Sequence, residues 1–362
     1  MKKNSVIVEK PLISIIMPVF NSGEYLDTAI NSILCQRFEN FELIVVDDGS
    51  TDGSAEKCDK FAKNDSRIVV VHQKNRGICS ARNTALRMAR GEYVAFSDHD
   101  DEFLEGLLEN SYKRAKQDNA DLVKFCKKEF VIDDGVVVKT RETFLKDNTL
   151  KGKEISNSFF SLLNNKIIDC VWDSLIRKDT IINNGIYFDE SYKAGGEDID
   201  FITRLLLHVK VFSLIDKCYY LHYIRSGFST SAKFNPIKLD TARLLSKRIT
   251  EGAQKLGLNL FERKSEYMYQ MSFTLLNGVA SLLCNKECDF TQKEKLRYLQ
   301  QIRKESYLPE WFFKQSAFCI CSISKRYAFS YFLFKYNLYF LLFATNKLRS
   351  KHLLLKKYMR GK

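Results

Sequence analysis

The stretch YVAFSDHDDE, residues 93–102, joins a short apolar run to a dense cluster of acids. Residues 93–96 are apolar throughout, which predicts a short buried strand, and the acids follow at its carboxyl end. Carboxylates this close together repel one another unless a cation lies among them. Their oxygens suit Mg²⁺ or Mn²⁺, which complete their shells with water and phosphates. The stretch therefore predicts a divalent cation holding a diphosphate, although a solvated turn before an acidic helical turn would read the same way.

Other apolar runs end in the same manner. Residues 12–20 and 41–46 are nearly continuous apolar runs, as expected of strands buried on both faces, and each is followed by small polar residues and a helical pattern. A third strand is predicted over residues 67–72, with a helix over residues 78–90. Repeated strand, loop and helix predict an α/β fold with a mostly parallel sheet and helices on both faces. Because ligands bind at the carboxyl ends of such strands, Phe20, Asp47, Asp48, Asp98 and Asp100 are expected along one rim.

The next segments continue the alternation. Residues 103–117 predict a helix, residues 120–126 a strand, and residues 133–135 the turn of a hairpin. Gly195 and Gly196 then permit a sharp turn and a close approach of a ligand. Glu197 and Asp198 follow in the first turn of a helix that is predicted to reach residue 208. Acids at this position favour a ligand site, and they are equally typical of plain helix caps.

Taken together, these motifs resemble the inverting glycosyltransferases of family 2, which have the GT-A nucleotide-sugar fold. The resemblance covers roughly residues 11–230. The matching segments are Pro18-Val19-Phe20-Asn21, Val45-Val46-Asp47-Asp48-Gly49-Ser50-Thr51-Asp52, Asn75-Arg76-Gly77 with Ala81-Arg82-Asn83, Gly91-Glu92-Tyr93 with Asp98-His99-Asp100-Asp101, and Gly196-Glu197-Asp198.

The resemblance implies a nucleotide-sugar donor, expected to be a UDP-sugar. Phe20, beside Pro18, would lie against the uracil ring, and Asp48 would accept hydrogen bonds from the base or the ribose. Arg82 would help to hold the donor. Arg225 matches a segment, with His222 and Tyr223, that closes over the diphosphate.

The same resemblance implies the reactive groups. Asp98-His99-Asp100 matches the family's Asp-x-Asp motif, in which Asp100, with Asp98, would bind a Mn²⁺ or Mg²⁺ that bridges the diphosphate. His99 departs from the small polar residues common there, so it either faces the donor sugar or is solvated. Asp198 matches the family's catalytic base and Glu197 precedes it as a substrate contact.

A further departure from the family pattern concerns the acceptor side. Trp172 stands where the family often has Trp followed by Asn. Because Asp173 replaces that Asn, the contact with acceptor or sugar expected there is in doubt.

The cysteines and the N-terminus bear on the compartment. Ten cysteines occur without a Cys-x-x-Cys pair, a pattern typical of free thiols in a reducing compartment. Glu9 and Lys10 interrupt the apolar stretch near the start, so no cleaved signal is expected and the predicted location is the cytoplasm.

Charge divides the chain into two predicted domains. Residues 1–230 hold 32 Lys+Arg and 35 Asp+Glu, whereas residues 231–362 hold 25 and 9. The second region is predicted to be helical, and its last 52 residues contain 11 Lys+Arg, no acid and dense aromatics.

No uncharged run in these last 52 residues is long enough to span a bilayer. A segment lying on the inner face of an anionic membrane fits this composition, and the alternative is packing against the catalytic domain or a second copy in a homo-oligomer. Nucleic acid is not expected as a partner, because residues 1–230 are nearly neutral.

The predicted function is therefore a metal-dependent, inverting glycosyltransferase of the hexosyltransferase type. It would transfer a sugar to a glycan or a lipid-linked acceptor in cell-surface polysaccharide biosynthesis, such as capsule or lipopolysaccharide. One alternative is a nucleotidyltransferase that makes the nucleotide sugar, although this class needs a glycine-rich loop near the first strand, where Pro18-Val19-Phe20-Asn21 stands. The other is a non-catalytic partner with the same fold.

Overall fold

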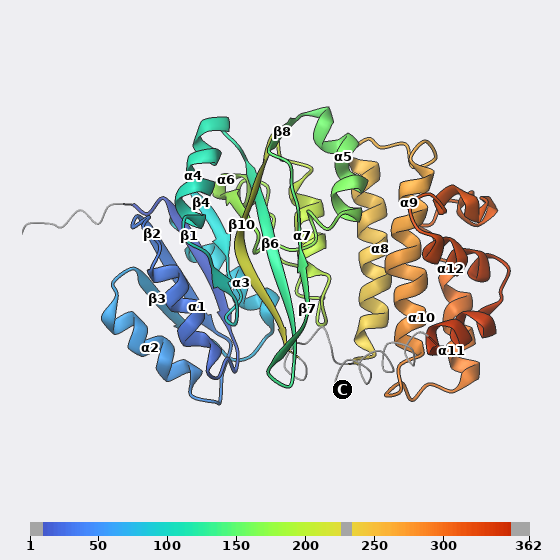
Figure 1. Cartoon of the computed structure of the whole chain (residues 1–362), viewed down its shortest axis with the longest axis horizontal. Coiled ribbons are helices and arrows are strands. Elements are labelled where there is room, and N and C mark those ends of the chain that lie inside the picture. The colour runs from blue at the N-terminus through green and yellow to red at the C-terminus, as the bar shows by residue number, and fades with distance from the viewer. Residues whose placement is uncertain (1–9, 226–233, 349–362) are drawn as a thin grey trace, which may run out of the picture. The chain divides into compact units, whose positions relative to one another are not determined.

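The computed structural model describes residues 10–225 and 234–348, so the predicted absence of a signal at residues 1–9 and the basic residues after 348 lie outside it. The described chain divides into two compact units (Figure 1). Unit 1 contains residues 10–155 and 166–191 and those from Glu197 to Arg225. Unit 2 contains residues 156–165 and 192–196 and those from Phe234 onward.

Unit 1 is built on a sheet that has ten strands among the described residues, in the order β3-β2-β1-β4-β9-β6-β10-β5, with β7 paired to β6 and β8 to β10. The strands are β1 (Ile13–Val19), β2 (Phe41–Asp47), β3 (Ile68–His72), β4 (Tyr93–Phe96), β5 (Glu102–Phe103), β6 (Leu122–Asp133), β7 (Val136–Glu142), β8 (Asn148–Lys151), β9 (Ser174–Arg177) and β10 (Val211–Arg225). The helices before residue 225 are α1 (Tyr25–Leu34), α2 (Ser54–Asn64), α3 (Ile78–Met88), α4 (Leu107–Asp118), α5 (Lys153–Asn164), α6 (Lys178–Ile182) and α7 (Glu197–Leu205). The predicted α/β fold with a mostly parallel sheet is confirmed.

Parallel pairing brings the polar strand exits to one edge of the sheet. β1 pairs with β2 and β4, and every residue of these three strands is buried, as their continuous apolar runs predict. The register sets Val19 beside Asp47, and Ile16 beside Phe96. The residues that follow β1, β2 and β4 therefore emerge on the same side.

The helix predicted over residues 103–117 is wrong at its start. Glu102–Phe103 form β5, which pairs antiparallel with β10, and the helix begins only at Leu107. Phe103 is buried, its N–H donates to Ser32 Oγ over 3.0 Å, and its ring lies 5.7 Å from that of Tyr220. Gly106, with φ +82°, then turns the chain into α4. Tertiary packing thus overrides the helical pattern of residues 103–106.

Gly91 lets the start of β4 lie directly against β1. Its N–H donates to Ser14 Oγ over 2.8 Å, and Ser14 in turn donates to Glu42 over 2.6 Å. A Cβ on Gly91 would lie 2.5 Å from the backbone nitrogen of Ser14. The backbone of Ser14 cannot move aside as the end of a flexible side chain could. A side chain at position 91 would therefore clash with β1, and glycine avoids the clash.

Unit 2 is helical, as predicted for the C-terminal region. Its elements from residue 234 are α8 (Ile237–Lys255), α9 (Lys264–Met271), the π-helical η1 (Ser272–Asn277), α10 (Gly278–Leu283), α11 (Gln292–Ile302), the short η2 (Phe312–Lys314) and η3 (Ala317–Ile320), and α12 (Lys325–Lys335). Thr291 and Glu294 form a reciprocal capping box at the start of α11. Among the described residues, none of the helices combines the length and the apolar character that crossing a bilayer requires.

Replacing Gly91 by alanine is expected to lower the free energy of unfolding by about 1–3 kcal/mol, because the new methyl group clashes with the β1 backbone. Urea denaturation followed by circular dichroism measures the change. Gly278→Ala is the control, since its Cβ meets only an ordinary contact at 3.5 Å and should not destabilise. Equal stability of Gly91→Ala and the parent protein would contradict the close approach of β4 to β1.

Candidate active site

The exits of β1 and β2 are tied together by hydrogen bonds. Asn21 Oδ1 accepts from the Thr51 N–H over 2.8 Å, and Asp52 accepts from the Gly23 N–H over 2.9 Å. Phe20, the first residue after β1, is 45% exposed, so its ring is available to a ligand. Pro18, by contrast, is buried within β1 opposite Val46, two residues short of the exit.

Asp48 organises the loop before α3. Its buried carboxylate accepts from the N–H groups of Arg76 and Gly77 over 2.9 and 2.7 Å, and from Gln73 Nε2 over 2.7 Å. The loop can follow the β2 exit closely because Gly77 adopts a φ of +93°. Asp48 thus fixes the loop of residues 73–77. Any hydrogen bond from a nucleotide would have to use the remaining lone pairs of the Asp48 oxygens.

Arg82 lies at the centre of the site and is only 1% exposed. Its Nη1 donates to Asp198 Oδ1 over 2.7 Å, and its Nη2 donates to Asp98 Oδ1 over 3.0 Å. Glu197 is 3.5 Å away, and the guanidinium lies 5.1 Å from the centre of the Phe188 ring. The sequence-predicted residues Arg82, Asp98, Glu197 and Asp198 are therefore brought together, from α3, the β4 exit and the start of α7.

Asp198 has the properties of a group that exchanges a proton near neutral pH. Its side chain is 14% exposed, and Oδ2 accepts from the Val171 N–H over 3.3 Å. Burial raises the pKa of Asp198 to about 7, against the lowering effect of Arg82. A carboxylate with this pKa is suited to act as a general base.

The Asp-x-Asp motif faces two arginines. Asp98 Oδ1 binds Arg82, and Asp100 Oδ2 binds Arg225 Nη1 over 2.9 Å. The Arg225 guanidinium also lies over the Tyr25 ring at 3.9 Å. These ion pairs use one oxygen of each aspartate. Between the two aspartates, His99 Nδ1 is buried with no hydrogen-bond partner among the described residues.

The donor set of the motif fits a hard divalent cation. Each aspartate has an oxygen outside its arginine pair, which is the ligand type that Mg²⁺ and Mn²⁺ take. His99 Nδ1, in the same motif, is buried without a hydrogen-bond partner among the described residues, so it is available to a polar ligand. Asp98 and Asp100 would hold the ion, and Arg225 would then have to exchange its pairing with Asp100 for one with an anionic ligand.

Trp172 is buried against two rings of β10. It is 6% exposed, and its ring stacks on Tyr220 at 4.5 Å and on His222 at 4.7 Å. Its neighbour Asp173 pairs with Lys124, and with Lys127 over 3.1 Å. Both partners of Asp173 in these ion pairs are buried lysines of β6.

A second cluster has the composition of a metal site but is already neutralised. The ligand atoms of Asp169, Cys170 and Asp173 lie within 4.8 Å of one another. Lys127 Nζ contacts Asp169 over 2.6 Å and Cys170 Sγ over 2.7 Å. Burial opposes the charge of Lys127, yet these acids keep the pKa of Lys127 above its ordinary value. The lysines supply the positive charge that a cation would otherwise bring.

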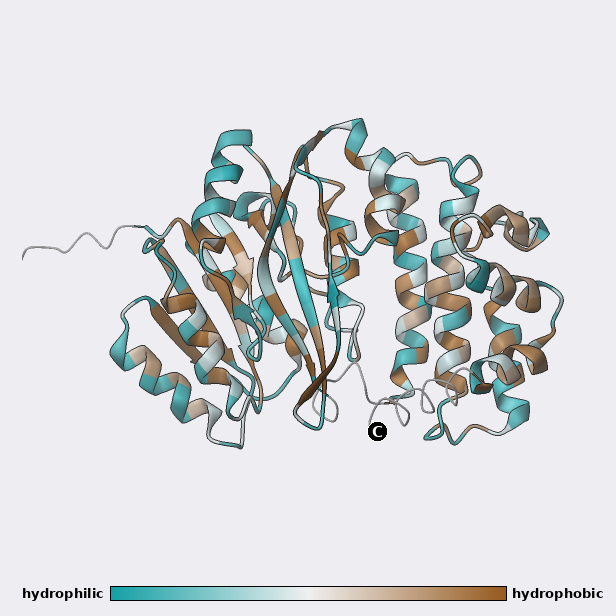
Figure 2. Cartoon of the chain, viewed as in Figure 1, coloured by the Kyte–Doolittle hydropathy of each residue, from teal (hydrophilic) through white to brown (hydrophobic). Residues whose placement is uncertain are grey.

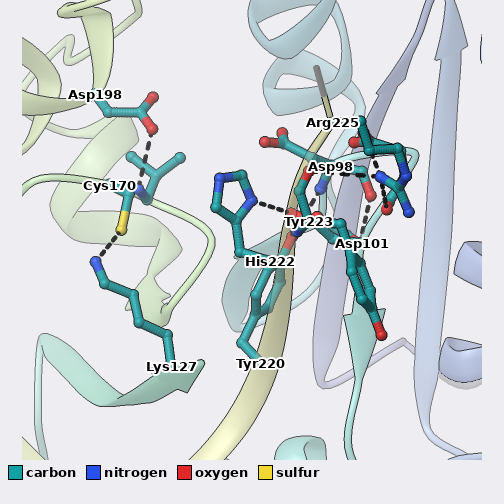
Figure 3. A network of polar contacts seen from close by, with 12 residues as sticks. Asp98, Asp101, Lys127, Cys170, Asp198, Tyr220, His222, Tyr223 and Arg225 are labelled. Atoms are coloured by element: carbon teal, nitrogen blue, oxygen red, sulfur yellow. Dashed lines mark hydrogen bonds and ion pairs between the residues drawn. The ribbon is translucent and has the colours of Figure 1, made fainter. Parts of the chain in front are cut away.

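Sequence reasoning missed the dyad of Asp101 and His222 (Figure 3). Asp101 is fully buried and accepts from Tyr220 Oη, His222 Nδ1 and the Tyr223 N–H, each over 2.9 Å. Burial raises the pKa of Asp101 to about 6. Burial alone would lower the pKa of His222, but the charge of Asp101 raises it to about 9, which favours the protonated ring. The signal in the sequence was an acid that follows the Asp-x-Asp motif directly.

Known proteins resemble this chain both in sequence and in fold. A family model described as glycosyl transferase family 2 matches residues 14–179. The cholesterol galactosyltransferase of Borreliella burgdorferi is 32% identical over 302 residues, which cover 80% of this chain and 82% of that protein. The uncharacterized glycosyltransferase EpsJ of Bacillus subtilis is 29% identical over 233 residues, covering 62% of this chain and 65% of that protein.

The fold is similar to that of S. aureus TarS residues 1–349 in complex with UDP-GlcNAc. The TM-score is 0.69 at 20% identity, and the match covers 97% of this chain and 92% of that one. The extent of the match to the Borreliella burgdorferi enzyme, together with the family model, identifies the chain: it belongs to glycosyl transferase family 2.

Proposed function

We propose that this glycosyltransferase is a metal-dependent, inverting enzyme that transfers a sugar from a UDP-sugar to a hydroxyl group. The observation that carries the proposal is the position of Arg82, which holds the Asp-x-Asp acid Asp98 and the base Asp198 on one guanidinium. A donor diphosphate and an acceptor hydroxyl need such groups a few ångströms apart. The UDP-GlcNAc complex of TarS, which has a similar fold, supports a UDP-sugar as the donor.

Asp198 takes the proton of the acceptor hydroxyl in this mechanism. Inversion requires one base on the face opposite the leaving group and no nucleophile from the protein. Arg82 is a positioning residue, because its two ion pairs fix Asp198 relative to Asp98. The guanidinium of Arg225, which pairs with Asp100, would provide positive charge for the diphosphate, and His222 lies on the same strand.

Asp98 and Asp100 would hold Mn²⁺ or Mg²⁺, which when bound stabilises the departing phosphate as a Lewis acid. Phe20 offers an exposed ring for the uracil base beside the loop that Asp48 holds. His99 lies between the two metal-binding acids with an unpartnered buried nitrogen, which favours the donor over solvent as its partner.

We further propose an acceptor at the membrane, either a lipid-linked glycan or a lipid hydroxyl, in the assembly of capsule, lipopolysaccharide or another cell-surface polysaccharide. The name of the Borreliella burgdorferi relative, a cholesterol galactosyltransferase, supports a lipid hydroxyl. The enzyme would work in the cytoplasm, at the inner face of the cell membrane. The nucleotidyltransferase alternative is disfavoured because the β1 exit has Phe20-Asn21 in place of a glycine-rich loop with a basic residue.

Asp198→Asn is expected to lower kcat for sugar transfer by about 10²–10⁴-fold, because the amide cannot accept the acceptor's proton. Release of UDP measures turnover, and calorimetry should show that the donor still binds. Asp134→Asn, in the β6–β7 turn at φ +50°, is the matched control and should retain full activity. Unchanged turnover in Asp198→Asn would remove Asp198 from its role.

The pH dependence should report the same group. Because burial raises the pKa of Asp198 to about 7, protonation should inactivate the base below that pH. We expect kcat/KM to rise with pH and to level off above about 7. The residual rate of Asp198→Asn should not show this rise. A profile that is flat between pH 5 and 8, or the same profile in both proteins, would contradict the assignment.

Chelation with EDTA should abolish transfer, and Mn²⁺ or Mg²⁺ should restore it. Asp100→Asn should raise the metal concentration needed to promote UDP binding, as followed by calorimetry without turnover. Asp169→Asn is the matched control, because its carboxylate pairs with Lys127 in the second cluster. Metal-independent UDP binding by the parent protein would argue against the proposed role of Asp98 and Asp100.

A further inference from the structure

The outward face of α12 carries aromatic rings where a water-facing helix carries polar side chains. Phe329, Phe332 and Tyr336 recur at helical spacing and are 45%, 41% and 55% exposed. The rings of Phe332 and Tyr336 lie 4.9 Å apart. Tyr331 and Phe334 fill the opposite, buried face. The helix therefore has aromatic residues on its exposed as well as its buried side, and Figure 2 shows brown, hydrophobic positions along its ribbon.

The next helical segment, residues 339–348, also exposes large apolar side chains. Phe340 is 80% exposed and Leu341 is 47% exposed. We define the aromatic patch as Phe329, Phe332, Tyr336, Phe340 and Leu341. Side chains of this size are seldom left in water together unless they meet a partner.

The patch rests on a fixed element. Ser324 caps the start of α12 by accepting from the Tyr327 N–H. At its end, Arg303 Nη1 donates to the carbonyls of Phe334 and Lys335, each over 2.8 Å. Phe329 and Phe332 thus project from a helix whose ends are both held by hydrogen bonds, and their exposure is a property of the folded unit.

The charges beside the patch have one sign. Lys325 and Arg326 are exposed at the start of α12, and Lys335 lies at its end. The described residues from 311 to 348 include five Lys+Arg and no Asp or Glu. The partner must therefore be apolar and negatively charged. A second copy meeting this face about a two-fold axis would set basic residues against basic residues, which the charges oppose.

We propose that the aromatic patch and the basic residues beside it bind the surface of an anionic lipid bilayer, with the rings at the level of the headgroups. Aromatic side chains favour this interface, and each nearby Lys or Arg strengthens attraction to anionic lipids. The proposal deepens the proposed function, because it identifies the surface through which the enzyme reaches a membrane acceptor.

Flotation of the full-length protein with vesicles tests the proposal. The protein should float with vesicles of phosphatidylglycerol and phosphatidylcholine, and not with phosphatidylcholine alone, and high salt should release it. The triple variant Phe329→Ser, Phe332→Ser, Phe340→Ser should lower partitioning more than about tenfold. Lys325→Glu with Arg326→Glu should lower it by at least about 25-fold, at about fivefold for each of the two positive charges removed.

Matched controls carry the same changes elsewhere. Phe144→Ser removes a ring that is 79% exposed in unit 1, and Lys60→Glu with Lys63→Glu reverses two exposed charges on α2. Neither should alter flotation. Circular dichroism and release of UDP with a soluble acceptor verify that each variant is folded, and they report the proposed function separately from membrane binding.

Three results would overturn the proposal. One is failure of the parent protein to float with anionic vesicles, and another is flotation of the patch variants to the same extent as the parent protein. A concentration-dependent dimer that the triple variant abolishes, seen by analytical ultracentrifugation without lipid, would identify the patch as an interface between copies.

Discussion

A buried positive charge decides how the site is assembled. Arg82 is held inside unit 1, where a lone guanidinium would be very costly, so acids must surround it. Asp98 comes from the β4 exit, and Asp198 and Glu197 from the start of α7, about a hundred residues later. The ion pairs of Arg82 with Glu197 and Asp198 therefore join the start of α7 to α3. Removing one acid would leave charge uncompensated, which links the stability of this region to its chemistry.

A second buried network supports the other side of the site. Lys124 and Lys127 on β6 pair with Asp173, and Lys127 lies 4.9 Å from the Trp172 ring. Trp172 in turn stacks on His222, which Asp101 holds from the strand exit. Charged side chains on β6 and β10, directly before β9 and after β4, are thus connected through one aromatic ring. This network fixes the His222 imidazole against Asp101, which directly follows the Asp-x-Asp motif.

Part of this arrangement is predictable from the sequence. Continuous apolar runs predict buried strands, and parallel strands bring their exits to one edge, so Asp48, Asp98 and Asp100 could be placed in one region. The pairing of Arg82 with Asp198 could not, because no local pattern relates residues that far apart. The same holds for Lys124 and Asp173. The sequence places Phe103 in a helix, whereas pairing with β10 makes it a strand residue. The spacing of apolar residues along the chain carries no information about this pairing.

The most direct measurement is a crystal structure of the protein with Mn²⁺ and UDP, with the manganese located by anomalous diffraction. We expect one manganese peak beside the carboxylates of Asp98 and Asp100, against the diphosphate, with Arg82 still joining Asp98 to Asp198. A peak at Asp169 and Asp173, or a nucleotide bound away from Arg82, would contradict the assignment of this site.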